Sequence, residues 1–262
     1  MIDVFCIPLS KDRLRAMPKE ERSLFLLLGY AANQITLHSK LVIFSTNRTP
    51  SELVEQHISG AQSQMLARLA IGVLDETWKL ISKRFLGSPI GKEFEPKLSP
   101  TGQQALTELK RHFGGSNLLS TLRNNFAFHH PYDTDVDAGF EAAAKDVNWD
   151  NDWNWYFSHA TFNSFYFLSD VVILHGILNA VGETDLVEAQ KKIMSDVNKV
   201  SGHLLNFICA LTEAFLGKHF GSELQAEVVA KIDNAPSVFD VWIPFYVETP
   251  TDDTNIGSRP PP

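Results

Sequence analysis

A short run near the middle of the chain gathers the side chains best suited to chemistry on phosphate esters. Arg123, Asn124, His129 and His130 stand close together there, and Pro131 follows them directly. A guanidinium holds a phosphate with a rigid fork of donors, and an imidazole gives or takes a proton near neutral pH. These residue types point to phosphate recognition with acid–base chemistry.

The apolar residues around this run predict the element that positions it. They recur at helical spacing, as Leu119, Leu122, Phe126 and Ala127. We therefore expect a helix that begins at Asn117 and continues through Arg123 to about Phe128. Pro131 restricts the residue before it to extended backbone and should end that helix. The candidate groups would then lie at the end of a buried helix.

The run Arg123-Asn124-x-x-Ala127-Phe128-His129 resembles the signature of the HEPN superfamily, in which an arginine and a polar residue precede a histidine by a few positions. Elsewhere the resemblance amounts to a mostly helical chain. It implies an all-α domain and a homodimer with the motif at the interface. It also implies metal-independent endoribonuclease activity, as in a toxin or defence effector, with RNA as substrate and an antitoxin protein as a partner. It implies no cofactor.

In that hypothesis the motif residues divide the reaction between them. Arg123 would stabilise the negative charge on a pentacoordinate phosphate. His129 would act as general base or acid for attack by a ribose 2′-hydroxyl, an effect worth roughly a hundred- to ten-thousand-fold. Asn124 would bind the phosphate or orient the histidine.

The spacing of Arg123 and His129 favours two copies of the chain. On an ideal helix these residues lie about a third of a turn away from a common face. Two copies that face each other across a two-fold axis would pool two arginines and two histidines in one cleft. His130 lies almost above Arg123 on such a helix and is the alternative imidazole; the family pattern favours His129.

Two other functions remain open from the sequence. The domain could be a non-catalytic binding module for RNA, a nucleotide or a partner protein, or a structural dimeric scaffold. In either case Arg123 and the histidines would satisfy carbonyl groups at the helix end and pair with Asp133.

The residues after Pro131 offer a weaker metal-binding pattern. Asp133, Asp135 and Asp137 resemble the start of a calcium loop, but alanine stands where that loop needs glycine at position six and glutamate at position twelve. With the two histidines these carboxylates could hold a divalent metal. A solvated acidic loop is the expectation.

Three tryptophans follow in alternation, at Trp149, Trp153 and Trp155. Such side chains can stack on unpaired bases. They pack more often in an interior or at a dimer contact, which is the expectation here.

Composition narrows the class of protein. The 262 residues are 44% hydrophobic and carry a net charge of -8, which argues against a general nucleic-acid coat.

Cys6 and Cys209 stand in apolar settings and predict reduced core residues of a cytoplasmic protein. The most membrane-like run, 162–181, contains Asp170 and His175, so a buried helix is expected there and no membrane association.

The chain reads as a single domain over 1–248, with an acidic and aromatic insertion at about 132–160 and a disordered polar tail at 249–262. The expected fold is all-α, a bundle of long antiparallel helices, with at most a small two-stranded β element from the chain ends. In the first half of the chain we expect a strand at 2–7, a helix from Pro18 to about 42, and a capping box at 49–52 that opens a helix to about 81. A loop at 87–100 and a helix from 100 to 113 should follow. After the motif helix we expect a short helix at 140–145, helices at 164–180 and 184–220, and an edge strand at 238–247 paired with 2–7.

Overall fold

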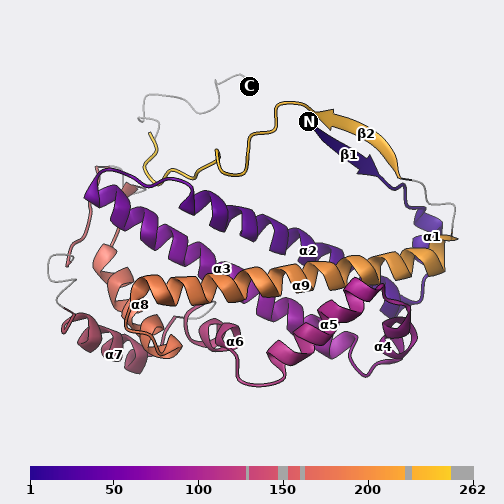
Figure 1. Cartoon of the computed structure of the whole chain (residues 1–262), viewed down its shortest axis with the longest axis horizontal. Helices are drawn as coiled ribbons and strands as arrows, with labels where there is room; N and C mark the ends of the chain where they lie inside the picture. The colour runs from indigo at the N-terminus through magenta and orange to yellow at the C-terminus, as the bar shows by residue number, and fades with distance from the viewer. Residues whose placement is uncertain (128–129, 147–152, 160–162, 222–225, 249–262) are drawn as a thin grey trace.

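The computed structural model describes residues 1–127, 130–146, 153–159, 163–221 and 226–248. It confirms a mostly helical chain with one small sheet. Three long helices, α2 (Lys19–Thr46), α3 (Leu53–Arg84) and α9 (Leu186–Phe220), run along the length of the molecule, and most of the shorter helices lie beneath them in Figure 1. The sheet lies at one end, above the helices.

The elements have the following bounds. The helices are α1 Lys11–Ala16, α2 Lys19–Thr46, α3 Leu53–Arg84, α4 Pro89–Phe94, α5 Pro100–Phe113, α6 Leu118–Leu122, α7 Asp133–Ala143, α8 Phe167–Val181 and α9 Leu186–Phe220. A 3-10 turn covers Glu95–Lys97, and a π-helical turn covers Arg123–Ala127. The strands are β1 Ile2–Cys6 and β2 Glu227–Ile232.

The main core lies where the three long helices meet. Each helix contributes an apolar stripe at helical spacing, which buries against the other two. The most enclosed side chains include Leu24, Leu28 and Ile35 of α2, Ile71, Leu74 and Ile81 of α3, and Leu204, Phe207, Leu211 and Phe215 of α9. These contacts fix the frame on which the shorter helices are placed.

Helix α9 is long and apolar enough over Glu188–Phe220 to cross a membrane by length and composition alone, a test that core helices also pass. Its apolar side chains at Val200, Leu204 and Phe207 are buried among the other helices. In this fold α9 therefore acts as a core helix.

Several helix boundaries follow the sequence signals. The Ser99 hydroxyl accepts a hydrogen bond from the backbone N–H of Gly102, and the Asn117 side chain accepts one from Ser120. Both are N-caps of the expected kind. Gly182 ends α8 in the left-handed conformation, with φ 71°.

Other boundaries correct the expectation. The capping box at 49–52 is wrong: α3 begins after Glu52 with no side-chain cap, and Gln56 instead donates to the carbonyls of Pro50 and Ser51. The stretch 87–100 is not a loop, because it contains α4 and the 3-10 turn that follows it. Ser88 caps the start of α4, as Ser99 caps the start of α5.

The predicted acidic loop and short helix are one helix, α7. Asp133 and Asp135 lie in its first turn, where negative charge is favourable beside the unpaired backbone N–H groups. The sequence analysis predicted a loop at these aspartates, so the observed helix begins earlier than expected. Trp149 and the tail 249–262 lie outside the described residues.

The strand that pairs with β1 is β2, and the expected strand at 238–247 is wrong. The pairing is antiparallel, with Ile2 opposite Ile232 and Cys6 opposite Glu227. The segment 238–247 contains Pro244, which cannot donate to a ladder. It runs instead beside the connection between α2 and α3, where Asn47 donates to the carbonyls of Val238 and Val241, each at 2.6 Å.

Both cysteines correct the expectation of a buried thiol. Cys6 and Cys209 are free and exposed. Cys6 lies in β1, all of whose residues are exposed, and Cys209 lies on the outer face of α9. Apolar neighbours in sequence did not imply burial: the neighbours of Cys209 on α9 point inward while it points outward, and the strand that contains Cys6 is exposed along its whole length.

Candidate functional site

Arg123 begins the π-helical turn that continues α6. The expected helix through this region is therefore present, but its last turn is wider than an α-helix. Single π-helical turns are rare and occur frequently at functional sites. The turn is packed against α8: the ring of Phe126 lies 3.3 Å from the position that a Cβ would take at Gly176.

Two carboxylates of α3 hold the Arg123 side chain. Its Nη2 lies 2.6 Å from Oε1 of Glu76, and its Nε lies 3.7 Å from Oδ2 of Asp75. Nη1 donates to the side-chain oxygen of Asn124 at 3.0 Å. The arginine side chain is 20% exposed, so it is held against the protein and still reaches solvent.

Asp75 is the buried centre of this network, with 2% of its side chain exposed. The Ser120 hydroxyl donates to its Oδ1 at 2.7 Å, and Nζ of Lys79 lies 2.7 Å from its Oδ2. We call Asp75, Glu76, Lys79, Ser120 and Arg123 the Arg123 cluster. Its two carboxylates balance its two cations.

The two carboxylates favour the charged form of Lys79. Burial disfavours the Lys79 ammonium, but hydrogen bonds to Asp75 and Glu76 outweigh it and raise the pKa of Lys79. Arg123 keeps unused hydrogen-bonding capacity: its Nε is buried, and the 3.7 Å separation from Asp75 is too long for a hydrogen bond.

The predicted site residues are only partly brought together in the described structure. Arg123 and Asn124 contact each other directly. His130 is exposed, just past the turn. His129 lies outside the described residues, so its role stays a prediction.

The structural alternative in which Arg123 pairs with Asp133 is wrong, since the partners of the arginine are Asp75 and Glu76. Sequence reasoning missed both carboxylates. A signal was present: Asp75 interrupts the otherwise apolar stripe through Ile71 and Leu74. A carboxylate at a core position needs a partner.

A hollow of about 220 Å³ lies between α2 and α3 beside the cluster. Its walls include Tyr30 and Gln34 of α2, and Glu76 and Leu80 of α3. Glu76 therefore contacts Arg123 and also faces a space that is lined partly by exposed side chains of α2.

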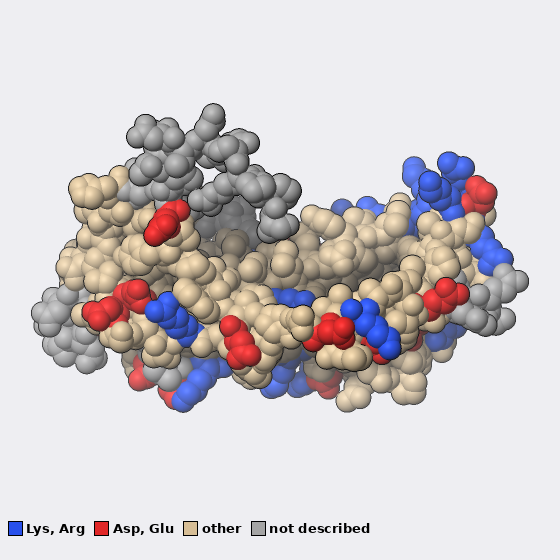
Figure 2. All heavy atoms as spheres, turned by 90° about the horizontal axis from the view of Figure 1, so that it is seen from above, with Lys and Arg blue, Asp and Glu red and all other residues tan. Residues whose placement is uncertain are grey.

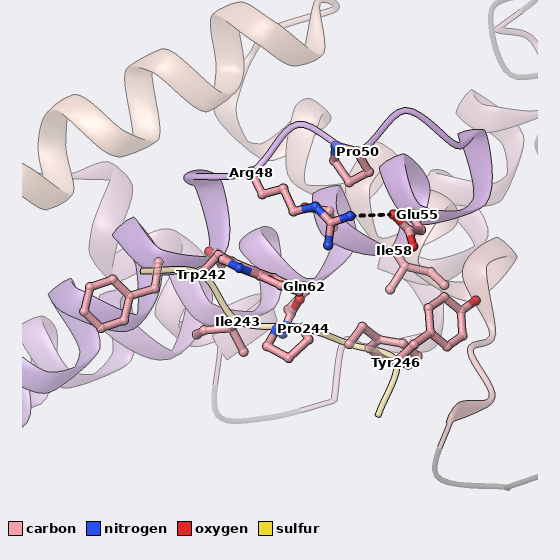
Figure 3. Close-up of a pocket in the computed structure, with 13 residues that line it drawn as sticks. Arg48, Pro50, Glu55, Ile58, Gln62, Trp242, Ile243, Pro244 and Tyr246 are labelled. Carbon is pink, nitrogen blue, oxygen red and sulfur yellow. Dashed lines mark ion pairs between the residues drawn. The ribbon is translucent and has the colours of Figure 1, made fainter. Parts of the chain in front are cut away.

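A second and smaller hollow, of about 70 Å³, lies where the segment 238–247 crosses the connection between α2 and α3. Figure 3 shows Arg48 between Glu55 and Trp242. Its guanidinium carbon lies 4.5 Å from the Trp242 ring centroid, and Nη2 lies 3.5 Å from Glu55. These contacts fasten the late segment to the helices.

The remaining sequence candidates are placed as follows. Asp133, Asp135 and Asp137 lie in a helix rather than a calcium loop, and the described residues include no group of three or more metal-ligating side chains placed to hold an ion. Trp153 and Trp155 are exposed and meet other rings edge-on, Phe140 at 5.5 Å and Tyr166 at 5.4 Å. Base stacking by these rings stays a prediction.

Comparison of the chain with protein-family models, with curated proteins and with solved structures finds no match.

Proposed function

We propose that the Arg123 cluster and His129 bind and cleave RNA without a metal ion, at a site shared by two copies of the chain. The observation that carries the proposal is the arginine held by carboxylates at a π-helical turn, next to Asn124. A positioned guanidinium stabilises developing negative charge without having to reorganise during the reaction.

The contacts of Arg123 leave donors for a phosphate. A guanidinium has five N–H donors. One on Nη2 meets Glu76, one on Nη1 meets Asn124, and the Nε–H is buried, which leaves the second N–H of each terminal nitrogen for other partners. The carboxylates thus orient the guanidinium and leave some of its N–H groups available to a ligand.

The reaction needs a base and an acid besides this fork. His129 takes the proton of a ribose 2′-hydroxyl, and the 2′-oxygen attacks the adjacent phosphorus. The bond from phosphorus to the 5′-oxygen breaks, and a second imidazole, from His130 or from the other copy, protonates that oxygen. The products are a 2′,3′-cyclic phosphate and a 5′-hydroxyl.

The dimer is supported by the surface beside the cluster. Tyr30 of α2, which lines the hollow beside Glu76, is 61% exposed, and Leu26 and Leu37 of the same helix are each 56% exposed. Figure 2, the view from above, shows most of the charged side chains along one long edge and at one end of the molecule. Exposed apolar surface of this kind is typical of interaction sites.

A second candidate function is a binding module that holds RNA or a partner protein without cutting. The observation in its favour is that Asp75 and Glu76 offset the charges of Lys79 and Arg123. The cluster therefore has no net positive charge with which to stabilise the transition state of cleavage. Under this alternative, His129→Ala would leave binding intact and no variant would change the length of the RNA.

Mixing two inactive variants tests the shared site. Arg123→Ala and His129→Ala should each be inactive as a pure preparation. Subunit exchange between them produces mixed dimers with one arginine and one histidine, and cleavage should partly return. The size of the particle, measured by light scattering, should correspond to two chains. A monomer, or mixtures as inactive as their components, would contradict the shared site.

A further inference from the structure

A third hollow, of about 160 Å³, lies between α3, α8 and the start of α9. Helix α3 contributes Gly60, Gln64 and Arg68 at intervals of four, which places them on one face. Helix α8 contributes Asp170 and α9 contributes Gln190. An apolar cavity of about 150 Å³ is known to admit benzene, so a single six-membered ring fits this volume.

One wall of this hollow is an ion pair with unused hydrogen-bonding capacity. Nη2 of Arg68 lies 3.4 Å from Oδ1 of Asp170, and the two side chains are 15% and 17% exposed. This long contact is the only hydrogen bond that the described structure gives either side chain. The other donors of the guanidinium and the second carboxylate oxygen are available to a ligand.

The rest of the lining consists mainly of apolar side chains, together with the side-chain amides of two glutamines. Ala61, Val171 and Ile177 are buried in its lining. The half-buried Gln64 and Gln190 make no side-chain hydrogen bond to any described residue. His57 lies against one side, with its ring stacked on Phe167 at 4.3 Å. An apolar cleft with a few convergent polar groups is the usual form of a small-molecule site.

The charges of the lining select against ions. Arg68 and Asp170 cancel, so the hollow has no net charge to offer an anion or a cation. Burial lowers the pKa of Arg68 and raises that of Asp170, in each case against the pull of the partner. A further charge placed here would lose its hydration without gaining an unpaired counter-ion.

We infer that this hollow binds a neutral six-membered aromatic ring that carries a carboxamide or lactam group. The carbonyl of an amide accepts from Arg68, its N–H donates to Asp170, and the ring fills the apolar space beside Val171. An amide is the neutral group that complements both members of an arginine–aspartate pair. This site is separate from the Arg123 cluster, and its occupancy does not depend on RNA cleavage.

Nicotinamide and nicotinate provide a matched pair of probes, since they have almost the same shape and differ in charge. Calorimetric titration of the purified chain should show saturable binding of nicotinamide and at least tenfold weaker binding of nicotinate. Equal binding of the two, absence of nicotinamide binding at millimolar concentration, or tighter binding of a pyrimidine nucleotide than of nicotinamide would overturn the inference.

Gly60 gives a variant that fills the space without disturbing the fold. Gly60 belongs to the lining, and a Cβ there would meet no atom within 4 Å, so Gly60→Leu adds a side chain at the hollow without a clash. Nicotinamide binding should fall at least tenfold, and Gly60→Ala should give a smaller loss. Gly202→Leu is the control, because Gly202 has the same open surroundings on α9 and lies outside this lining.

The polar wall is tested by removing both members of the ion pair together. Arg68→Met with Asp170→Leu keeps the volume and leaves no unpaired charge. Circular dichroism should show an unchanged helical fold, and the preference for nicotinamide over nicotinate should disappear. Retention of that preference in the double variant would overturn the assigned contacts.

Discussion

At the scale of single residues, Asp170 illustrates how burial can outweigh an ion pair. Its carboxylate lies beside Arg68, yet its pKa is raised above 3.8 because desolvation is the largest effect. A raised pKa means that the ionised form costs folding stability. The contribution of this group is therefore fully present below the unfolded pKa and is lost as pH rises through the folded pKa.

Asp170→Asn tests this sign. The variant does not ionise at this position, so its melting temperature relative to wild type should rise as pH increases through the folded pKa of Asp170. Thermal unfolding of both chains across the acidic range measures it. A relative melting temperature that falls with increasing pH would show that the attraction of Arg68 exceeds the desolvation cost.

The sequence predicted Arg123 and Asn124 as site residues; their side chains are hydrogen-bonded in the structure, and their role in a site stays a prediction. It did not identify Asp75 and Glu76, because long-range pairs between α3 and the turn after α6 depend on how the helices pack. Local patterns report which groups are near in sequence. The partners of a guanidinium are set by tertiary contacts.

At the scale of elements, α7 and α8 approach each other closely at glycine. A Cβ at Gly139 would lie 2.4 Å from the backbone oxygen of Val172 and 3.1 Å from the nitrogen of Gly176. Because backbone atoms cannot move aside cheaply, these two helices need a residue without a side chain at this crossing.

Gly139→Ala should therefore push the helices apart and destabilise the fold. A cost of about 1–3 kcal/mol is typical of overpacking, and it would lower the melting temperature by roughly 2–12 °C. Gly202→Ala is the control, since its Cβ would meet no atom within 4 Å. That change, at an exposed position in the interior of α9, should instead stabilise by roughly 0.5–1 kcal/mol. Equal effects of the two variants would refute the close approach.

The long elements could be predicted because their signals are local. Apolar spacing gave α2, α3, α8 and α9, and Ser99 and Asn117 gave the starts of α5 and α6. The strand that pairs with β1 could not be chosen in this way. Both 227–232 and 238–247 contain β-branched residues. The segment 227–232 pairs with β1, whereas 238–247 contains Pro244 and is bonded by Asn47.

At the scale of the whole molecule, the segment 238–247 ties the end of the described chain to the connection between α2 and α3. Figure 1 shows it crossing above the helices toward that connection. Asn47 holds its backbone at Val238 and Val241, and Arg48 lies over Trp242. Farther along, Asn163 bonds both backbone groups of Val247, and the Phe245 ring packs on Phe165. The part near Val238 and Val241 depends mainly on Asn47 and Arg48, so it should open independently of the helical core.

Asn47→Ala should release the part of this segment near Val238 and Val241. Two hydrogen bonds of about 1 kcal/mol each would be lost, which raises the detached population roughly tenfold or more. Chymotryptic cleavage near Phe239 and Trp242 should accelerate accordingly, without a change in helical content. Thr46→Ala is the control, because its hydroxyl bonds only to carbonyls of its own helix. Unchanged cleavage in Asn47→Ala would contradict the proposed attachment.

RNA cleavage in the presence of a chelator tests most directly the chemistry proposed for Arg123. Wild type and Arg111→Ala, an exposed arginine on α5 that pairs with Glu108, should cut RNA to products ending in a 2′,3′-cyclic phosphate. Arg123→Ala should be at least a hundredfold slower, as expected for loss of a group that stabilises transition-state charge. Intact RNA with wild type, or equal cleavage by wild type and Arg123→Ala, would contradict the account.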